Sequence, residues 1–191
     1  MKQTLWNIRE RVYNFFHYRK TLKKNIKAVL SCRGNHNIFI ETGTHKGNMI
    51  NGVKGYFRKI YSFELGRDLW FSSFKRFRYN HSIKIIWGDS AEELPKILEV
   101  IKEPCLFWLD AHYSGGETAR ADEDTVIEKE LAVVLKHPYN HTILIDDARL
   151  FNGRDGYPTR AKLEEIVRNS KYTLELKDDI FRLTFNPKSV Y

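Results

Sequence analysis

The stretch IFIETGTHKG, residues 38–47, joins a short apolar run to an acidic residue and to a turn that contains two glycines. The run at 38–40 predicts a short buried strand that ends at Glu41, and a helix is expected over residues 47–58. The two glycines allow the backbone to approach a ligand closely at the start of that helix. Their spacing differs from G-x-G-x-x-G and from the P-loop pattern, which disfavours a dinucleotide pyrophosphate site and a nucleoside triphosphate site.

Short apolar runs alternate with helical stretches along the rest of the chain. Strands separated by helices pair in parallel with right-handed crossovers. We therefore expect an α/β fold: a Rossmann-like, doubly wound, mostly parallel sheet with a C-terminal antiparallel hairpin and an N-terminal helix. The further strands are expected at 60–63, 83–87, 106–109 and 142–145, the hairpin at 172–176 and 181–185, and helices at 4–30, 67–79, 122–136 and from about Pro158 and Thr159.

One more helix is expected to begin at Ser90. Ser90 and Glu93 have the spacing of a capping box, in which each side chain bonds to the backbone of the other. Pro95 lacks a backbone N–H and is expected to end or kink the first turn of this helix.

An acidic residue ends each of the five strands that are expected to pair in parallel. In an open parallel sheet, ligands bind beyond the carboxyl ends of the strands. A single carboxylate after a strand is often a helix cap, but acids after all five strands indicate a ligand site. These acids are Glu41, Glu64, Asp89, Asp110, Asp146 and Asp147.

The first three of these strand ends predict a nucleoside site. Glu64 lies about twenty residues beyond the glycine-containing turn, where an acid accepts hydrogen bonds from both ribose hydroxyls. Asp89, within Gly88-Asp89-Ser90, is expected to pair with the amino group of adenine. Together with a turn that needs no pyrophosphate, this describes a nucleoside with a short polar tail. The expected cofactor-binding residues are Glu41, Thr42, Gly43, Thr44, Gly47, Glu64, Asp89 and Ser90.

Residues 37–186 resemble the class I S-adenosylmethionine-dependent methyltransferases in the order and content of these motifs. The Glu-Thr-Gly-x-x-x-Gly turn, Leu109-Asp110 and Ile145-Asp146-Asp147 look most like the macrocin O-methyltransferase branch. Members of that branch methylate sugar hydroxyls with the help of a divalent metal. The resemblance implies that Asp110, Asp146 and Asp147 hold the metal, and His112 occupies the position of that branch's acidic general base.

The chemistry of methyl transfer agrees with this assignment. A hydroxyl is a poor nucleophile at neutral pH, and Mg²⁺ held by three carboxylates would lower its pKa. We expect Asp110 and His112 to be catalytic, because histidine has a suitable pKa to accept the released proton. Two alternatives stay open: a metal-independent enzyme in which His112 alone is the base, and a methyltransferase-like binding module without catalysis.

The acceptor is expected to be a small-molecule or carbohydrate hydroxyl. The sequence lacks the Asn/Asp-Pro-Pro-Tyr/Phe signature of amino-directed methyltransferases, which favours oxygen as the acceptor atom. The expected substrate loops are 113–124 and 149–160. Their arginines, Arg120, Arg149 and Arg154, either hold an acidic acceptor by bidentate contacts or are solvated loop residues.

The positive charge is concentrated near the N-terminus. The 191 residues carry a formal net charge of +8, and the first thirty contain eight lysines and arginines against one acid, Glu10. This predicts a basic amphipathic arm and loop, residues 1–34, attached to a methyltransferase domain, residues 35–191. The arm packs on its own domain or on a second subunit, or it contacts a membrane surface peripherally, whereas nucleic acid is unlikely as a partner. Neither a signal peptide nor a spanning helix is apparent, so we expect a cytoplasmic protein, either free or peripheral at the inner face of a membrane.

Overall fold

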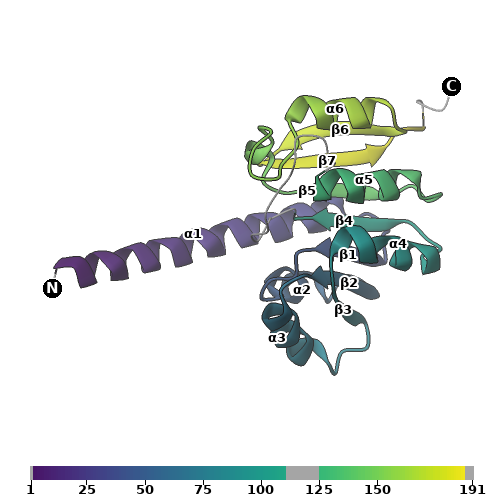
Figure 1. Cartoon of the computed structure of the whole chain (residues 1–191). Coiled ribbons are helices and arrows are strands. Elements are labelled where there is room, and N and C mark those ends of the chain that lie inside the picture. The colour runs from purple at the N-terminus through teal and green to yellow at the C-terminus, as the bar shows by residue number, and fades with distance from the viewer. Residues whose placement is uncertain (1, 111–124, 188–191) are drawn as a thin grey trace.

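The chain forms a seven-stranded sheet in the order β3-β2-β1-β4-β5-β7-β6 (Figure 1). The computed structural model describes residues 2–110 and 125–187. The first five strands pair in parallel, and β7 runs antiparallel to both β5 and β6. This confirms the expected doubly wound sheet with its C-terminal hairpin. The strands are β1 Ile38–Thr42, β2 Lys59–Glu64, β3 Ile83–Trp87, β4 Cys105–Leu109, β5 Thr142–Ile145, β6 Tyr172–Lys177 and β7 Ile180–Phe185.

Helices cover both faces of the sheet (Figure 1). Alternate residues of each strand point to opposite faces, so that Phe39 and Trp108 join one core while Ile40 and Phe107 join the other. The first core also contains residues of α1, α2 and α3, and the second contains residues of α4, α5 and α6. The helices are α1 Lys2–Cys32, α2 Asn48–Val53, α3 Arg67–Phe77, α4 Ser90–Val100, α5 Val126–Lys136 and α6 Arg160–Arg168, with a 3₁₀ turn at Ala148–Leu150.

Three details of α2 and α4 differ from the sequence predictions. The helix expected over 47–58 is the short α2, which ends at Val53. In α4 the N-cap is Asp89, whose side chain accepts a hydrogen bond from the Ala91 N–H, and not Ser90. The helix continues through Pro95 to Val100, so Pro95 does not end it, and the alternative expectation of a kink stays a prediction.

The capping box of the described residues lies at the start of α5 instead. The Thr125 hydroxyl accepts from the Glu128 N–H, and the Glu128 carboxylate accepts from the Thr125 N–H. These two bonds satisfy backbone donors that have no partner inside the helix. α5 therefore begins at Val126, four residues after the predicted start at 122.

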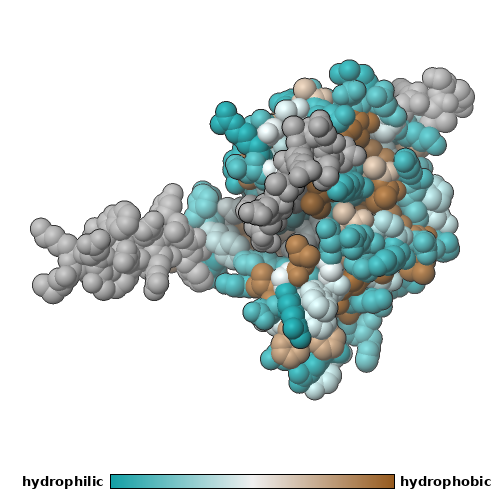
Figure 2. Space-filling view, viewed as in Figure 1, coloured by the Kyte–Doolittle hydropathy of each residue, from teal (hydrophilic) through white to brown (hydrophobic). Residues whose placement is uncertain are grey.

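The long helix α1 has two different halves. Its second half packs on the domain, where Ala28 and Val29 are buried and the Lys24 ammonium donates to the Asp178 carbonyl at 2.8 Å. A glycine at position 52 permits close packing of α1 on α2, because a Cβ there would collide with the Ile26 side chain. The first half extends away from the sheet (Figure 1). On the sheet-bearing part of the molecule, the face shown in Figure 2 is mostly hydrophilic with scattered apolar residues. The division at residue 34 stays a prediction, but the second half of α1 lies within the packing of the domain.

A chain of histidines lies at the amino ends of β4 and β5. The Cys105 N–H donates to His141 Nδ1 at 3.0 Å, so His141 carries its proton on Nε2 and donates to His137 Nδ1 at 2.8 Å. His137 Nε2–H then donates to the Leu98 carbonyl at 3.0 Å. Burial, followed by the nearby His137 and His36, lowers the pKa of His141 to about 3. His141 is therefore neutral near pH 7, and the histidine chain is a structural link at the edge of the sheet opposite to the strand ends that carry the acids.

Candidate functional site

A pocket of about 910 Å³ lies at the carboxyl edge of the parallel strands. Its volume is in the range of small-molecule and cofactor sites. Ten of the residues predicted for the site line it: Glu41, Thr42, Gly43, Thr44, Glu64, Asp89, Ser90, Asp110, Asp146 and Asp147. Gly47 is not among the lining residues, and His112 lies outside the described part of the chain.

The turn after β1 is held against its neighbouring strands. The N–H groups of Gly43 and Thr44 donate to the Phe63 carbonyl at 3.0 and 2.9 Å. Gly43 has a φ of 93°, and a Cβ at this position would lie 3.0 Å from the Asp110 carbonyl oxygen. A larger residue would therefore be strained and would crowd the end of β4, so glycine leaves the turn free to form the pocket wall.

Gly47 has a role in packing that the sequence did not predict. It has a φ of 67°, and a Cβ there would lie 2.5 Å from the ring of Phe77 in α3. This glycine therefore permits α3 to pack against the start of α2. Its close neighbour is a side chain of the core, and its expected contact with the cofactor stays a prediction.

Glu64 at the end of β2 is held in one orientation by backbone donors. Its Oε2 accepts from the His45 N–H at 2.7 Å, and its Oε1 accepts from the Gly66 N–H at 2.8 Å. The residue is 6% exposed and lines the pocket. Each carboxylate oxygen has a second lone pair, so both remain able to accept a hydrogen bond from a ligand.

Asp89 combines two roles at the start of α4. Its Oδ1 accepts from the Ala91 N–H at 2.8 Å, which makes it the helix cap. It also lines the pocket beside Ser90. The cap fixes one oxygen and leaves the other available, so the cap and the expected contact with adenine are compatible.

Two buried acids lie in the wall of the pocket. Burial is the main cause that raises the pKa of Glu41 to about 8 and that of Glu130 to about 7. The Ser62 hydroxyl donates to Glu41 at 2.7 Å, and the Thr42 hydroxyl donates to Glu130 Oε2 at 3.4 Å. Glu130 Oε1 is buried and has no hydrogen-bond partner among the described residues.

Glu130 was missed by the sequence reasoning. The signal was an acid on the apolar face of α5, three residues after Ile127 and four before Val134, both of which are fully buried. A charged residue in such a stripe is almost never fully buried without a reason. Its position in the pocket wall supplies that reason.

Helix α1 forms one side of the pocket, which the sequence also did not indicate. The Asn25 side-chain amide donates to Asp146 Oδ2 at 2.6 Å, while its own Oδ1 is buried without a partner in the described chain. Thr21, one turn earlier, lines the pocket as well. A polar residue at position 25, three residues after Leu22 and four before Val29 on the apolar face, was the available signal.

The three aspartates predicted to bind a metal have other partners. Burial, and then Asp110 and Asp147, raise the pKa of Asp146 to about 7. Asp146 accepts from Asn25 and from the Asp147 N–H, and Asp147 forms an ion pair with Arg149 at 2.7 Å. Within the described residues, no three carboxylates, histidines or cysteines have the geometry of a metal site. As the side chains stand, Asp146 and Asp147 are thus engaged by protein partners, and the three-aspartate metal site stays a prediction.

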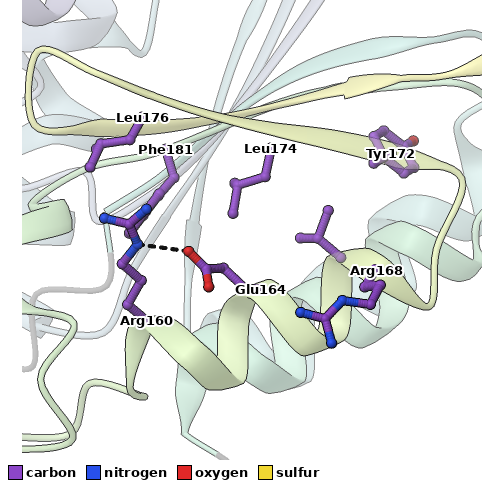
Figure 3. A pocket seen from close by; sticks show the side chains of 8 residues that line it. Arg160, Glu164, Arg168, Tyr172, Leu174, Leu176 and Phe181 are labelled. Atoms are coloured by element: carbon purple, nitrogen blue, oxygen red, sulfur yellow. Dashed lines mark hydrogen bonds and ion pairs between the residues drawn. The ribbon is translucent and has the colours of Figure 1, made fainter.

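A second, smaller pocket lies between α6 and the hairpin (Figure 3). It measures about 350 Å³, and Leu174 and Tyr172 of β6 face the helix across it. An ion pair between Arg160 and Glu164, 2.8 Å long, lies at one end (Figure 3). None of the predicted site residues lines it.

The fold is that of the class I S-adenosylmethionine-dependent methyltransferases. A putative caffeoyl-CoA O-methyltransferase from Staphylococcus aureus has a TM-score of 0.59 and 14% identity, covering 93% of this chain and 91% of that one. The 23S rRNA methyltransferase ErmE has a TM-score of 0.56 and 16% identity over 86% of this chain and 68% of that one. A Podospora anserina methyltransferase bound to SAH (S-adenosylhomocysteine) has a TM-score of 0.55 and 15% identity, over 83% and 76%.

No family model matches the sequence, and no curated protein matches it. At these identities the structures establish the fold alone, so the macrocin O-methyltransferase branch stays a prediction. Among the described residues, no helix has the length and apolar character needed to cross a membrane.

Proposed function

We propose that this protein binds S-adenosylmethionine in the large pocket and transfers its methyl group to an oxygen of a small substrate. The observation that carries the proposal is the placement of Glu64, Gly43 and Asp110 in one pocket at the carboxyl edge of a methyltransferase-type sheet. Other methyltransferases of this fold include a putative O-methyltransferase and rRNA methyltransferases, so the fold leaves the acceptor open.

The nucleoside end of the pocket is assigned to Glu64 and Asp89. The lone pairs of Glu64 that the backbone leaves free would accept hydrogen bonds from the ribose hydroxyls, and the second oxygen of Asp89 would accept one from the adenine amino group. Leu65 and Leu69, which also line this end, offer apolar contact to the base. Bound S-adenosylmethionine supplies a methyl group on a positively charged sulfur, and the nearby carboxyl groups of Glu41 and Asp110 favour that charge.

Asp146 is the described residue best suited to accept the proton of the acceptor hydroxyl. A general base works best when its pKa is near the operating pH, and the pKa of Asp146 is about 7. Asn25 holds this carboxyl in place. Bound S-adenosylmethionine would supply the methyl group for an in-line displacement by the hydroxyl oxygen, and Asp146 would take up the proton that this oxygen loses. The predicted base His112 remains the alternative, since it lies outside the described residues.

A metal-free reaction is favoured by the pairing of the aspartates. Asn25 and Arg149 already supply hydrogen bonds and positive charge where Mg²⁺ was expected. Arg149 also forms an ion pair with Asp179, so it serves the local structure and is a poor candidate for holding an acidic acceptor. A small-molecule or carbohydrate hydroxyl remains the expected acceptor, and a requirement for Mg²⁺ remains a prediction to be tested.

Titration calorimetry tests the cofactor assignment directly. S-adenosylmethionine and S-adenosylhomocysteine are expected to bind with micromolar affinity, and NAD is expected not to bind. Failure of both adenosyl compounds to bind the folded protein would overturn the proposed function.

A further inference from the structure

A cluster of partly exposed apolar residues covers the outer side of α3 at the end of β3. The exposed fractions are 61% for Leu65, 50% for Phe71, 42% for Phe74 and 53% for Trp87. Trp70 connects them, because its ring stacks on Phe74 at 5.6 Å and on Trp87 at 5.7 Å between centroids. We call these five residues the aromatic patch. In Figure 2, apolar and hydrophilic surface lie side by side over α3 and β3, at the lower end of the view.

The rings of the patch are held firmly in position. The Trp87 indole N–H donates to the Leu65 carbonyl at 3.2 Å, and the Trp70 indole N–H donates to the Ile85 carbonyl at 3.4 Å. Both polar atoms are thus satisfied inside the protein, while about half of the Trp87 residue remains exposed. The patch is a rigid surface that offers apolar contact and few hydrogen bonds.

Positive side chains border the patch. The Arg67 guanidinium lies 5.8 Å from the centre of the Trp87 ring, and the Lys75 ammonium lies 4.5 Å from that of Phe71. Arg78 follows on the same helical face, because residues 67, 71, 74, 75 and 78 are three or four apart. Asp68 is the one acid in α3. The surface is therefore apolar at the aromatic patch and positively charged around it.

We propose that the aromatic patch docks the protein on an anionic lipid bilayer. Exposed aromatic rings bordered by lysine and arginine are typical of surfaces that lie at the membrane interface, where rings enter the apolar layer and cations meet lipid phosphates. A single-stranded nucleic acid would also meet cations and rings, but it needs free ring faces on which bases stack. Here each ring already has another ring or a cation against it.

The docking surface adjoins the large pocket. Leu65 belongs to the patch and also lines the pocket, next to Leu69 on the first turn of α3. A bilayer in contact with the patch would therefore lie at the rim of the nucleoside end. This surface is distinct from the basic α1 helix, and it does not depend on the proposed methyl transfer.

Co-sedimentation of the full chain with vesicles tests the proposal. Binding is expected to phosphatidylcholine vesicles that contain phosphatidylglycerol, to weaken as salt rises, and to be lost with phosphatidylcholine alone. Phe71→Ser with Phe74→Ser is expected to lower the partition coefficient at least about tenfold. Lys75→Glu is expected to lower it at least about fivefold, since each basic residue at an anionic surface contributes about that factor. Leu176→Ser and Lys162→Glu, at exposed positions of the hairpin and α6, are the matched controls and should bind like the native chain.

Melting temperatures within a few degrees of the native value establish that the variants are folded. The variant Lys20→Glu with Lys23→Glu on α1 separates the two basic surfaces. Loss of vesicle binding in the α1 variant, with native binding in both patch variants, would overturn the proposal. Failure of the native chain to bind the anionic vesicles would also overturn it, and loss of binding to a single-stranded oligouridine in the patch variants would then assign the patch to nucleic acid.

Discussion

Asn25 and Asp146 are joined by a hydrogen bond of 2.6 Å although 121 positions separate them in the sequence. The bond links helix α1 to the end of β5, at the acid-rich end of the large pocket. Replacement Asn25→Leu removes the donor and leaves the buried Asp146 oxygen without its partner. We expect a loss of about 1–3 kcal/mol in the free energy of unfolding, measured by denaturant titration. The control Lys27→Leu, at an exposed position of the same helix, should change it little.

Glu64 provides the sharpest test of the nucleoside site. Glu64→Gln retains a group of the same size but only one acceptor oxygen, so it is expected to weaken S-adenosylhomocysteine binding at least about tenfold, or about 1.4 kcal/mol. Binding is measured by calorimetry, with Glu175→Gln on the exposed side of β6 as the control. Native affinity in folded Glu64→Gln would discard the ribose contact.

The raised pKa of Glu41 predicts that cofactor binding depends on pH. With a pKa of about 8, this carboxyl is mostly protonated in the free protein at pH 7. A sulfonium cation in the pocket would lower that pKa, so the complex releases protons, and affinity for S-adenosylmethionine is expected to rise as pH increases towards about 8. Calorimetry in buffers of different ionisation enthalpy measures the release. Glu41→Gln should reduce the proton release, as should S-adenosylhomocysteine, whose sulfur is uncharged. Equal binding enthalpies in all buffers would contradict the prediction.

The pairing of Asp146 with Asn25 and of Asp147 with Arg149 predicts the absence of a tight divalent-metal site. Mg²⁺ and EDTA are both expected to leave the melting temperature unchanged. Direct titration with Mn²⁺, followed by electron paramagnetic resonance, should show no saturable site of micromolar affinity. Saturable Mn²⁺ binding that disappears in Asp146→Asn would instead restore the three-aspartate metal site.

The neutral histidine chain predicts a contribution to acid sensitivity. The folded protein holds the pKa of His141 at about 3, whereas the unfolded chain protonates this residue below about 6.5. The unfolded state thus binds more protons, and this residue makes the fold less stable as pH falls from about 6.5 towards 3. The raised pKa values of Glu41, Glu130 and Asp146 mean that the folded state binds more protons at these acids, so they make the fold more stable as pH falls. The contribution of His141 must therefore be measured as a difference between variants.

His141→Gln isolates that contribution. The difference in unfolding free energy between the native chain and this variant should shrink as pH is lowered from 7 to 5. The exposed His81→Gln is the control for replacing a histidine by glutamine. A constant difference for His141→Gln would contradict the neutral chain.

The fold was predictable from the sequence because it follows from local patterns. Apolar runs ending in acids place Glu64 and Asp110 at one edge once the strands pair in parallel. Contacts between distant segments were not predictable in this way. The role of Gly47 depends on Phe77, which lies thirty positions later, and the shortness of α2 is accompanied by close packing of Gly52 against Ile26.

The sequence predicted the acids at the strand ends of the pocket. It did not predict Glu130 or the side chains that form hydrogen bonds and ion pairs with these acids. Asn25 and Glu130 look like polar interruptions in apolar helical faces, and only the packed structure brings them into the pocket wall. The metal assignment followed from three aspartates at neighbouring strand ends. The metal assignment did not anticipate that the protein itself supplies partners for Asp146 and Asp147. Asn25, which donates to Asp146, is distant in sequence. The ion pair between Arg149 and Asp147 forms where the backbone of Asp147 has a φ of 55°.

The order of the last two strands has a consequence for synthesis on the ribosome. β7 is made after β6 but lies between β5 and β6. Until residues 180–185 have emerged, the backbone of β5 has an unpaired edge, and the hairpin has no place in the sheet. The nascent chain therefore cannot complete the sheet by adding each strand in the order of its synthesis. The domain can therefore finish folding only after β7 has been made. A chain that stops before β7 exposes the unpaired edge of β5, which can pair with other chains.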